Sequence, residues 1–272
     1  MVADRSGQPG EQPAHHAENA AGPGRFLLTI IMPAYNEQMT IEEVIAHLRS
    51  VPIPGGAEFI FVNDGSSDAT PEILDRITDD RVIVVHHDAN RGKGAAIQSG
   101  IEKASGSHLL IFDADSEYDP ADIPRLVEPI LSGRAEIVFG SRMSGFGTVH
   151  PSLMHAVGNR TMTLFANLLY GSAISDLHTC LKLLPLPLVR SFRLEETGFG
   201  LDTEISAEML RSGFRPFEVP ASYVGRSKED GKKIRVADAV RCFYVLIKVR
   251  LRGRTSYGER NRNLAPPTRL SP

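Results

Sequence analysis

Short apolar runs and helical patterns alternate along the first half of the chain. The runs are continuously apolar, as is typical of strands buried on both faces of a parallel sheet, and short polar links join them to the helices. Alternation of this kind predicts an α/β fold, with a doubly wound, mostly parallel, Rossmann-like sheet and helices on both faces. The predicted strands are residues 26–32, 58–62, 82–86, 108–112 and 136–140.

The pattern changes after residue 142. A long helical pattern covers residues 153–170, and a polar-to-apolar turn at residues 175–182 leads into another element. A further helix ends near Ser212, and a strand is predicted at residues 214–219.

Residues 236–254 are predicted to form an amphipathic, basic helix. It is apolar almost all round, and its polar stripe contains Arg241 and Lys248. Further basic residues follow at Arg250, Arg252 and Arg254. Such a helix can lie on an anionic bilayer surface, and it can equally pack on the protein's own core. The pattern leaves both interpretations open.

Both ends of the chain are predicted to be disordered. Residues 1–25 are rich in Gly, Pro, Gln, Ala and His without periodicity, and residues 255–272 are polar and rich in proline. Residues 26–235 then form one folded domain ahead of the basic helix.

Composition narrows the function. The formal net charge of −3 argues against a protein that binds nucleic acid. The two cysteines, Cys180 and Cys242, form no Cys-x-x-Cys pair, which favours a reducing cytoplasm. No signal-peptide pattern is present, and no apolar run reaches the roughly 18 residues of a membrane span. We therefore expect a soluble folded domain.

An acidic motif follows the fourth predicted strand. Asp113, Asp115 and Glu117 alternate along the chain, so in an extended segment their side chains share one side. Their oxygens could then converge on a hard cation, Mg²⁺ or Mn²⁺, with open positions left for a diphosphate. An acidic turn that caps the following helix is the alternative.

Two other loops should reach the same edge, because they too follow strands. Asp64 can accept hydrogen bonds from a base or ribose, or it can serve only as a turn residue. Lys93, flanked by glycines at a helix start, can approach a phosphate. Together the loops indicate a nucleoside diphosphate. Further cations that could meet a second anion are Arg142, Arg226, Lys232 and Lys233.

Five ordered motifs carry a family resemblance. They are residues 32–37 (Met-Pro-Ala-Tyr-Asn-Glu), 62–68 (Val-Asn-Asp-Gly-Ser-Ser-Asp), 90–94 (Asn-Arg-Gly-Lys-Gly), 113–117 with its three acids, and 140–142 (Gly-Ser-Arg). In this order they resemble family 2 glycosyltransferases of the GT-A fold. Within that family the chain is most similar to the dolichyl- and polyprenyl-phosphate hexosyltransferases, the branch that includes dolichol-phosphate mannose synthase. The resemblance spans about residues 29–234, so residues 26–235 would be a GT-A domain.

The resemblance implies a role for each motif residue. The nucleotide-sugar pocket would contain Pro33, Tyr35, Glu37, Asp64, Lys93 and Asp113. The metal would be held by Asp113, Asp115 and Glu117. The acceptor phosphate would meet Arg142, Arg226 and Lys233. The residues expected to take part in catalysis are Asp115, Arg142, Asp202 and Arg226.

The sequence departs from relatives at three places. Glu117 stands where many have Gln, and Asn63 stands where many have Asp. The Gly-Lys-Lys at residues 231–233 replaces a Gly-x-Ser-Lys pattern, so the identity of the sugar stays open.

A lipid phosphate acceptor simplifies the expected chemistry. Its phosphate monoester is already ionised near neutral pH, so it can attack the anomeric carbon without a strong general base. We expect inverting, metal-dependent transfer of a hexosyl group from GDP-mannose or a UDP-hexose to a polyprenyl or dolichyl phosphate. Asp202, Glu204 and Asp176 are either groups that orient the acceptor or sugar, or structural acids.

Partners and location follow from that expectation. The protein would be cytoplasmic and peripheral on the inner face of the membrane, through its own helix or through a separate membrane protein. The alternatives are a glycosyltransferase with a soluble or protein acceptor, and a non-catalytic protein that only binds nucleotide sugars.

Overall fold

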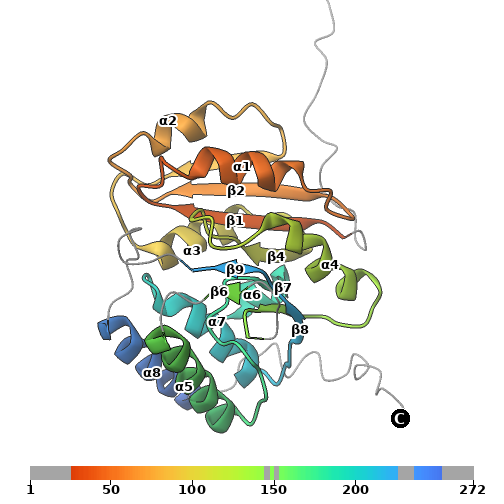
Figure 1. The fold of residues 1–272 in the computed structure, drawn as a ribbon, viewed down its shortest axis with the longest axis vertical. Helices are drawn as coiled ribbons and strands as arrows, with labels where there is room; N and C mark the ends of the chain where they lie inside the picture. Colours follow the sequence, from red (N-terminus) through yellow and green to blue (C-terminus); the bar gives the residue numbers. More distant parts are fainter. Residues whose placement is uncertain (1–25, 144–147, 150–152, 226–235, 253–272) are drawn as a thin grey trace, which may run out of the picture.

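A central sheet organises the computed structural model, which describes residues 26–143, 148–149, 153–225 and 236–252. Within these ranges the sheet has seven strands in the order β3-β2-β1-β4-β7-β5-β8 (Figure 1). The strands are β1 (Leu28–Ala34), β2 (Ala57–Asn63), β3 (Val82–His86), β4 (His108–Ile111), β5 (Val138–Ser141), β7 (Lys182–Pro185) and β8 (Phe217–Pro220). A two-stranded ribbon pairs β6 (Thr148–Val149) with β9 (Tyr223–Val224). The α/β class with a mostly parallel sheet is confirmed.

Helices cover both faces of this sheet. One face packs against α1 (Ile41–Ser50), α2 (Thr70–Asp75) and α4 (Ile123–Leu131), which the short 3-10 helix η1 (Pro120–Asp122) precedes. The other face packs against α3 (Lys93–Lys103), α5 (Leu153–Tyr170), α6 (Leu186–Ser191), α7 (Gly200–Arg211) and α8 (Val236–Leu251). Alternate side chains of one strand enter opposite cores, as Ile30 and Ile31 of β1 do. Continuous apolar runs are needed for that reason.

The antiparallel strand β7 was not predicted. It lies between β4 and β5, with Leu183 opposite Leu110 and Val138. The prediction of successive strands 108–112 and 136–140 was right about the strands, but the two are not neighbours. Because β7 runs antiparallel, its first residue, Lys182, lies at the edge where the parallel strands end. Residues that precede β7 therefore join the same edge.

Helix α8 packs on the protein's own core, which is one of the two interpretations that the pattern of residues 236–254 left open. Cys242, Val245, Leu246 and Val249 are buried against α7 and α5. The polar stripe is ion-paired as well: Arg241 binds Glu196, Lys248 binds Glu195 and Glu196, and Arg252 binds Glu195, Glu204 and Glu208.

The opposite sides of α5 and α8 remain apolar and exposed. The two helices lie next to each other (Figure 1), and the rings of Phe165 and Phe243 meet between them at 5.1 Å. Their exposed apolar residues are three, four or seven positions apart and so form one stripe on each helix. They are Val157, Leu164 and Leu168 on α5, and Val240, Tyr244, Ile247 and Leu251 on α8. In the part of the chain described, none of the helices has the length and apolar character that crossing a bilayer requires.

Candidate functional site

The loops after β1 and β2 are joined by hydrogen bonds. The backbone amide of Asn36 donates to Ser66, and the amide of Ser67 donates back to the Asn36 side chain at 2.8 Å. Glu37 donates its amide to Thr70 at the start of α2. Pro33, Tyr35 and Glu37, expected in the nucleotide pocket, therefore lie together at the carboxyl edge and are partly exposed. Contact with a nucleotide stays a prediction for each of them.

Asp64 is buried and organises the neighbouring loop. Its carboxylate accepts hydrogen bonds from the amides of Arg91 (2.9 Å) and Gly92 (2.7 Å) and contacts Nδ1 of His87 at 2.7 Å. Only 2% of its surface is exposed. The structure thus shows Asp64 holding the loop that leads to Lys93, and its binding of a base or ribose stays a prediction.

The glycines beside Lys93 allow a close backbone contact. Gly92 has a φ of +96°, and a Cβ on it would lie 2.5 Å from the Thr197 carbonyl oxygen. A Cβ on Gly94 would lie 2.5 Å from the Glu196 carbonyl oxygen. These glycines let the start of α3 pack on residues 196–198, just before α7. Lys93 is thereby placed between the loop after β4 and the start of α7.

Lys93 links a carboxylate in the loop after β4 to a carboxylate in α7. Its ammonium lies 2.8 Å from Asp113, after β4, and 3.3 Å from Asp202, in the first turn of α7. Lys182, wholly buried at the start of β7, lies 3.8 Å from the other oxygen of Asp202. Burial opposes ionisation of Asp202, but the two lysines hold its pKa below the ordinary value. Charges therefore alternate along a row from Asp113 and Lys93, which are partly exposed, through Asp202 to the wholly buried Lys182.

The acidic loop, residues 113–119, is not extended. Turns follow β4, and Ser116 has a left-handed φ of 58°, so the expected alternation of side chains does not hold. Within the described ranges, no group of three or more His, Cys, Asp or Glu side chains is close enough to hold a metal ion. Lys93 instead contacts Asp113, and the Tyr223 hydroxyl donates to Glu117 at 2.9 Å.

The charge of this loop nevertheless suits a cation. Burial, together with the negative charges of Asp113 and Glu117, raises the pKa of Asp115 to about 7. A carboxylate whose ionisation is opposed in this way is stabilised by added positive charge. The donor atoms are all carboxylate oxygens, which suit Mg²⁺ or Mn²⁺.

A second group of side chains at the site is joined by hydrogen bonds within the group. We call it the Arg142 cluster (Arg142, Asn159, Asp176 and His178). Arg142 donates from Nε and Nη2 to both oxygens of Asp176, at 2.7 and 2.8 Å. Asn159 of α5 donates to the same carboxylate at 2.9 Å and contacts His178. Burial opposes ionisation of Asp176, but Arg142 holds its pKa well below the usual range. Asp176 is thus the group that orients Arg142.

Three residues of the charged row and the Arg142 cluster were not identified from the sequence. Asn159, His178 and Lys182 have no motif, although the 175–182 turn was noted as polar. Burial and nearby positive charge lower the pKa of His178 to about 4, so its ring is neutral near pH 7. Position is a signal for two of them, because His178 lies just before the antiparallel strand β7 and Lys182 begins it, whereas Asn159 lies within α5.

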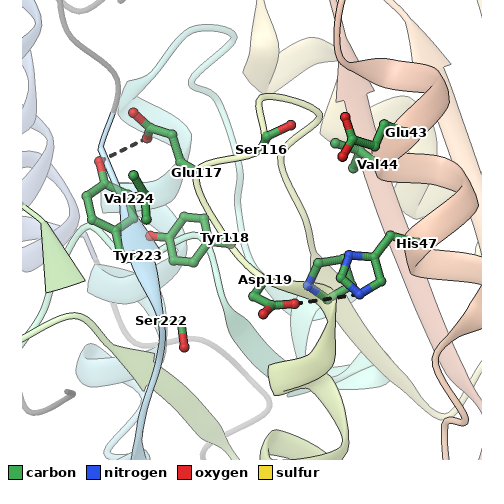
Figure 2. Close-up of a pocket in the computed structure, with 11 residues that line it drawn as sticks. Glu43, Val44, His47, Ser116, Glu117, Tyr118, Asp119, Ser222, Tyr223 and Val224 are labelled. Carbon is green, nitrogen blue, oxygen red and sulfur yellow. Dashed lines mark hydrogen bonds and ion pairs between the residues drawn. The ribbon is translucent and has the colours of Figure 1, made fainter. Parts of the chain in front are cut away.

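A cleft of about 330 Å³ lies on one side of the acidic loop (Figure 2). Glu43 and His47 of α1 form one wall, and Ser222 and Tyr223 form the other. Tyr223 reaches across to Glu117, which makes it the fourth residue that sequence reasoning missed.

The remaining predicted residues fall into two groups. Glu204 is structural, because its carboxylate accepts hydrogen bonds from the amides of Glu195 and Glu196 and pairs with Arg252. Arg226, Lys232 and Lys233, as well as residues 1–25 and 255–272, lie outside the described residues.

Solved structures share this fold. Glucosyl-3-phosphoglycerate synthase from Mycobacterium tuberculosis, in complex with UDP, matches with a TM-score of 0.64 over 84% of this chain and 80% of that chain. The same enzyme with Mn²⁺, UDP-glucose and phosphoglyceric acid matches with a TM-score of 0.63. Sequence identity is 18% and 20%, so these likenesses show the fold alone.

Relatives in sequence are hexosyltransferases and other glycosyltransferases. The chain is 31% identical over 209 residues to the low-salt glycan biosynthesis hexosyltransferase Agl6 of Haloferax volcanii. The match covers 74% of this chain and 49% of Agl6. It is 31% identical over 221 residues to glycosyltransferase AglD of the same organism, covering 78% of this chain and 35% of AglD. The chain thus spans about half of Agl6 and about a third of AglD. The family model for glycosyl transferase family 2 matches residues 29–185, from β1 to the end of β7, and the chain belongs to that family.

Proposed function

We propose that the chain is an inverting, metal-dependent hexosyltransferase that moves a hexosyl group from a nucleoside diphosphate sugar to a polyprenyl or dolichyl phosphate. GDP-mannose and UDP-hexoses are the candidate donors. The observation that carries the proposal is the charged row Asp113, Lys93, Asp202 and Lys182 beside the Arg142 cluster, at one sheet edge. Such an edge is where open α/β sheets bind their ligands.

Each part of the row has a role in this proposal. Asp113, Asp115 and Glu117, which are not gathered around one point in the structure, would turn toward Mg²⁺ or Mn²⁺ to hold it, and the ion would neutralise negative charge on the leaving diphosphate. Lys93 lies at the N-terminus of α3 and can turn its ammonium from Asp113 toward the diphosphate. Asp202 would then face the sugar or the acceptor, with Lys182 still beside it.

Arg142 is the buried cation that suits an acceptor phosphate. Asp176 holds its guanidinium in one orientation, so an incoming phosphate would meet a preorganised donor. The phosphate oxygen is ionised before it reacts, so the site has no need of a strong base to activate it. A single displacement with inversion follows from this arrangement.

A relative's acceptor supports a lipid phosphate. The chain is 30% identical over 168 residues to the UDP-N-acetylglucosamine–dolichyl-phosphate N-acetylglucosaminyltransferase of Methanococcus voltae, covering 55% of this chain. The exposed apolar stripes of α5 and α8 offer a surface for the bilayer that holds such an acceptor. We place the protein peripherally on the cytoplasmic face of the membrane, directly or through a separate membrane protein.

A product assay tests the proposed reaction. The purified chain is incubated with Mn²⁺ or Mg²⁺ and a panel of UDP- and GDP-sugars, with either polyprenyl phosphate or a water-soluble phosphate monoester as acceptor. Mass analysis should find a glycosylated lipid phosphate. Transfer only to the soluble acceptor would replace the lipid with that acceptor, and donor binding without transfer to either would leave a sugar-nucleotide-binding protein.

Variants of the acidic loop provide the matched control. Asp115→Ala should abolish transfer, while Asp119→Asn, in the same loop but directed toward His47, should retain it. Donor binding is measured by calorimetry for both variants. Equal transfer by the two would contradict the role of the acidic loop.

A further inference from the structure

Tyr223 of β9 lies between the acidic loop and the Arg142 cluster. Its hydroxyl donates to Glu117 Oε2 at 2.9 Å, and its ring centroid lies 5.0 Å from Cζ of Arg142. Only 3% of its surface is exposed. One side chain thus touches both a carboxylate of the acidic loop and the cation of the Arg142 cluster (Figure 2 shows the hydroxyl and Glu117).

The two contacts use different parts of the tyrosine. The hydroxyl donates a charge-assisted hydrogen bond that fixes the direction of the Glu117 carboxylate. The ring presents its electron-rich face to the Arg142 guanidinium, whose donors Nε and Nη2 are held by Asp176. Removing the hydroxyl should therefore affect Glu117 and leave the stacking on Arg142 in place.

The backbone keeps Tyr223 in position. Tyr223 forms a bridge with Tyr118, and their rings meet at 5.1 Å. The next amide, Val224 N, donates to the Glu117 carbonyl at 2.9 Å. On the other side, Ala221 N donates to Ser141, directly before Arg142. The segment is thereby tied to both groups that Tyr223 contacts.

We propose that Tyr223 is a positioning residue that sets Glu117 relative to Arg142, and so sets the bound metal relative to the acceptor phosphate. The inference rests on the proposed function, because it assigns a metal to Glu117 and a phosphate to Arg142. Partners that orient a metal ligand from outside the coordination sphere typically contribute 10–100-fold to metal affinity. Correct spacing between donor and acceptor contributes to the rate separately.

Two substitutions separate the contacts. Tyr223→Phe removes the hydroxyl and keeps the ring, and Tyr223→Leu removes both. Mn²⁺ affinity is measured by electron paramagnetic resonance at saturating UDP or GDP, and KM for polyprenyl phosphate is measured by sugar transfer at saturating Mn²⁺. Tyr223→Phe should weaken Mn²⁺ binding about tenfold with KM for the acceptor within about threefold of wild type. Tyr223→Leu should also raise that KM by about tenfold.

Tyr118→Phe is the matched control. It removes a buried hydroxyl from the adjacent ring, which lies near the Cys180 amide rather than Glu117, and should leave Mn²⁺ affinity within twofold. Tyr223→Phe that binds Mn²⁺ as tightly as wild type would overturn the inference while wild-type transfer still supports the proposed function. Wild-type protein that binds no Mn²⁺ would overturn both. Circular dichroism confirms the fold of each variant, and the result for Tyr223→Phe decides the inference if Tyr223→Leu unfolds.

Discussion

The acidic loop and the Arg142 cluster lie at the same edge of the sheet, but the carboxylate is opposed by like charges in the loop and paired with a cation in the cluster. In the loop, burial together with the negative charges of Asp113 and Glu117 raises the pKa of Asp115 to about 7. In the cluster, Asp176 is fully buried yet paired by both oxygens with Arg142, and its pKa falls well below the usual range. The cluster is balanced by the protein alone, whereas an added cation would stabilise the loop. Substitutions in the two regions should therefore change folding stability with opposite signs.

The largest expected effect is in the cluster. Asp176→Ala leaves the Arg142 guanidinium buried without its carboxylate and should lower the free energy of unfolding by about 3–5 kcal/mol. Urea denaturation of wild type and variant measures the loss. The double variant Arg142→Met with Asp176→Leu should recover much of it, because no buried charge is then left unpaired. Equal losses in the single and double variants would argue against a charge-based explanation.

The acidic loop should respond in the other direction. Asp115→Asn removes a charge that the folded state disfavours, so it should raise the free energy of unfolding by about 2–4 kcal/mol at pH 8 without metal. The sign follows from the raised pKa: the carboxyl destabilises the folded state increasingly as pH rises from about 4 to 7. The same variant should lose Mn²⁺ binding. A destabilised Asp115→Asn protein would refute the contrast between the regions.

The two regions also differ in how far the sequence predicted them. Strands β1 to β4 follow apolar runs of ordinary length, so their ends and the loops behind them were predictable. Strand β7 passes straight into α6 without a loop, so its end carries no sequence signal. Its antiparallel direction is a tertiary property, and only that direction brings His178 and Lys182 to the site. The left-handed φ of Ser116 and the two-residue strand β9, which contains Tyr223, likewise have no signal in the sequence.

Acid pH should sharpen the contrast through His178. Its pKa of about 4 lies below the ordinary 6.5, because the folded state keeps the buried ring neutral. The unfolded chain takes up a proton as pH falls from 6.5 to 4 and the folded protein does not, so the free energy of unfolding should fall by up to about 3 kcal/mol. His108, at the other end of β4, has a pKa lowered to about 4 by burial and adds a similar loss.

Variants apportion that pH dependence. His178→Gln should roughly halve the loss of unfolding free energy between pH 6.5 and pH 4, and His108→Gln should do the same independently. Denaturation across this pH range measures both slopes. A His178→Gln slope equal to that of wild type would show that the cluster does not hold a neutral imidazole.

The smallest expected effect tests how closely the start of α3 approaches the segment before α7. Gly94 lets the helix that carries Lys93 pack on residues 196–198, and a Cβ there would lie 2.5 Å from a backbone oxygen. Gly94→Ala should therefore lower the free energy of unfolding by about 1–2 kcal/mol through overpacking. Gly158→Ala is the matched control, because it adds the same methyl group inside helix α5 with nothing within 4 Å, and it should raise stability by about 0.5–1 kcal/mol. If both substitutions stabilised the protein, the contact that brings Lys93 between Asp113 and Asp202 would not be as close as the structure shows.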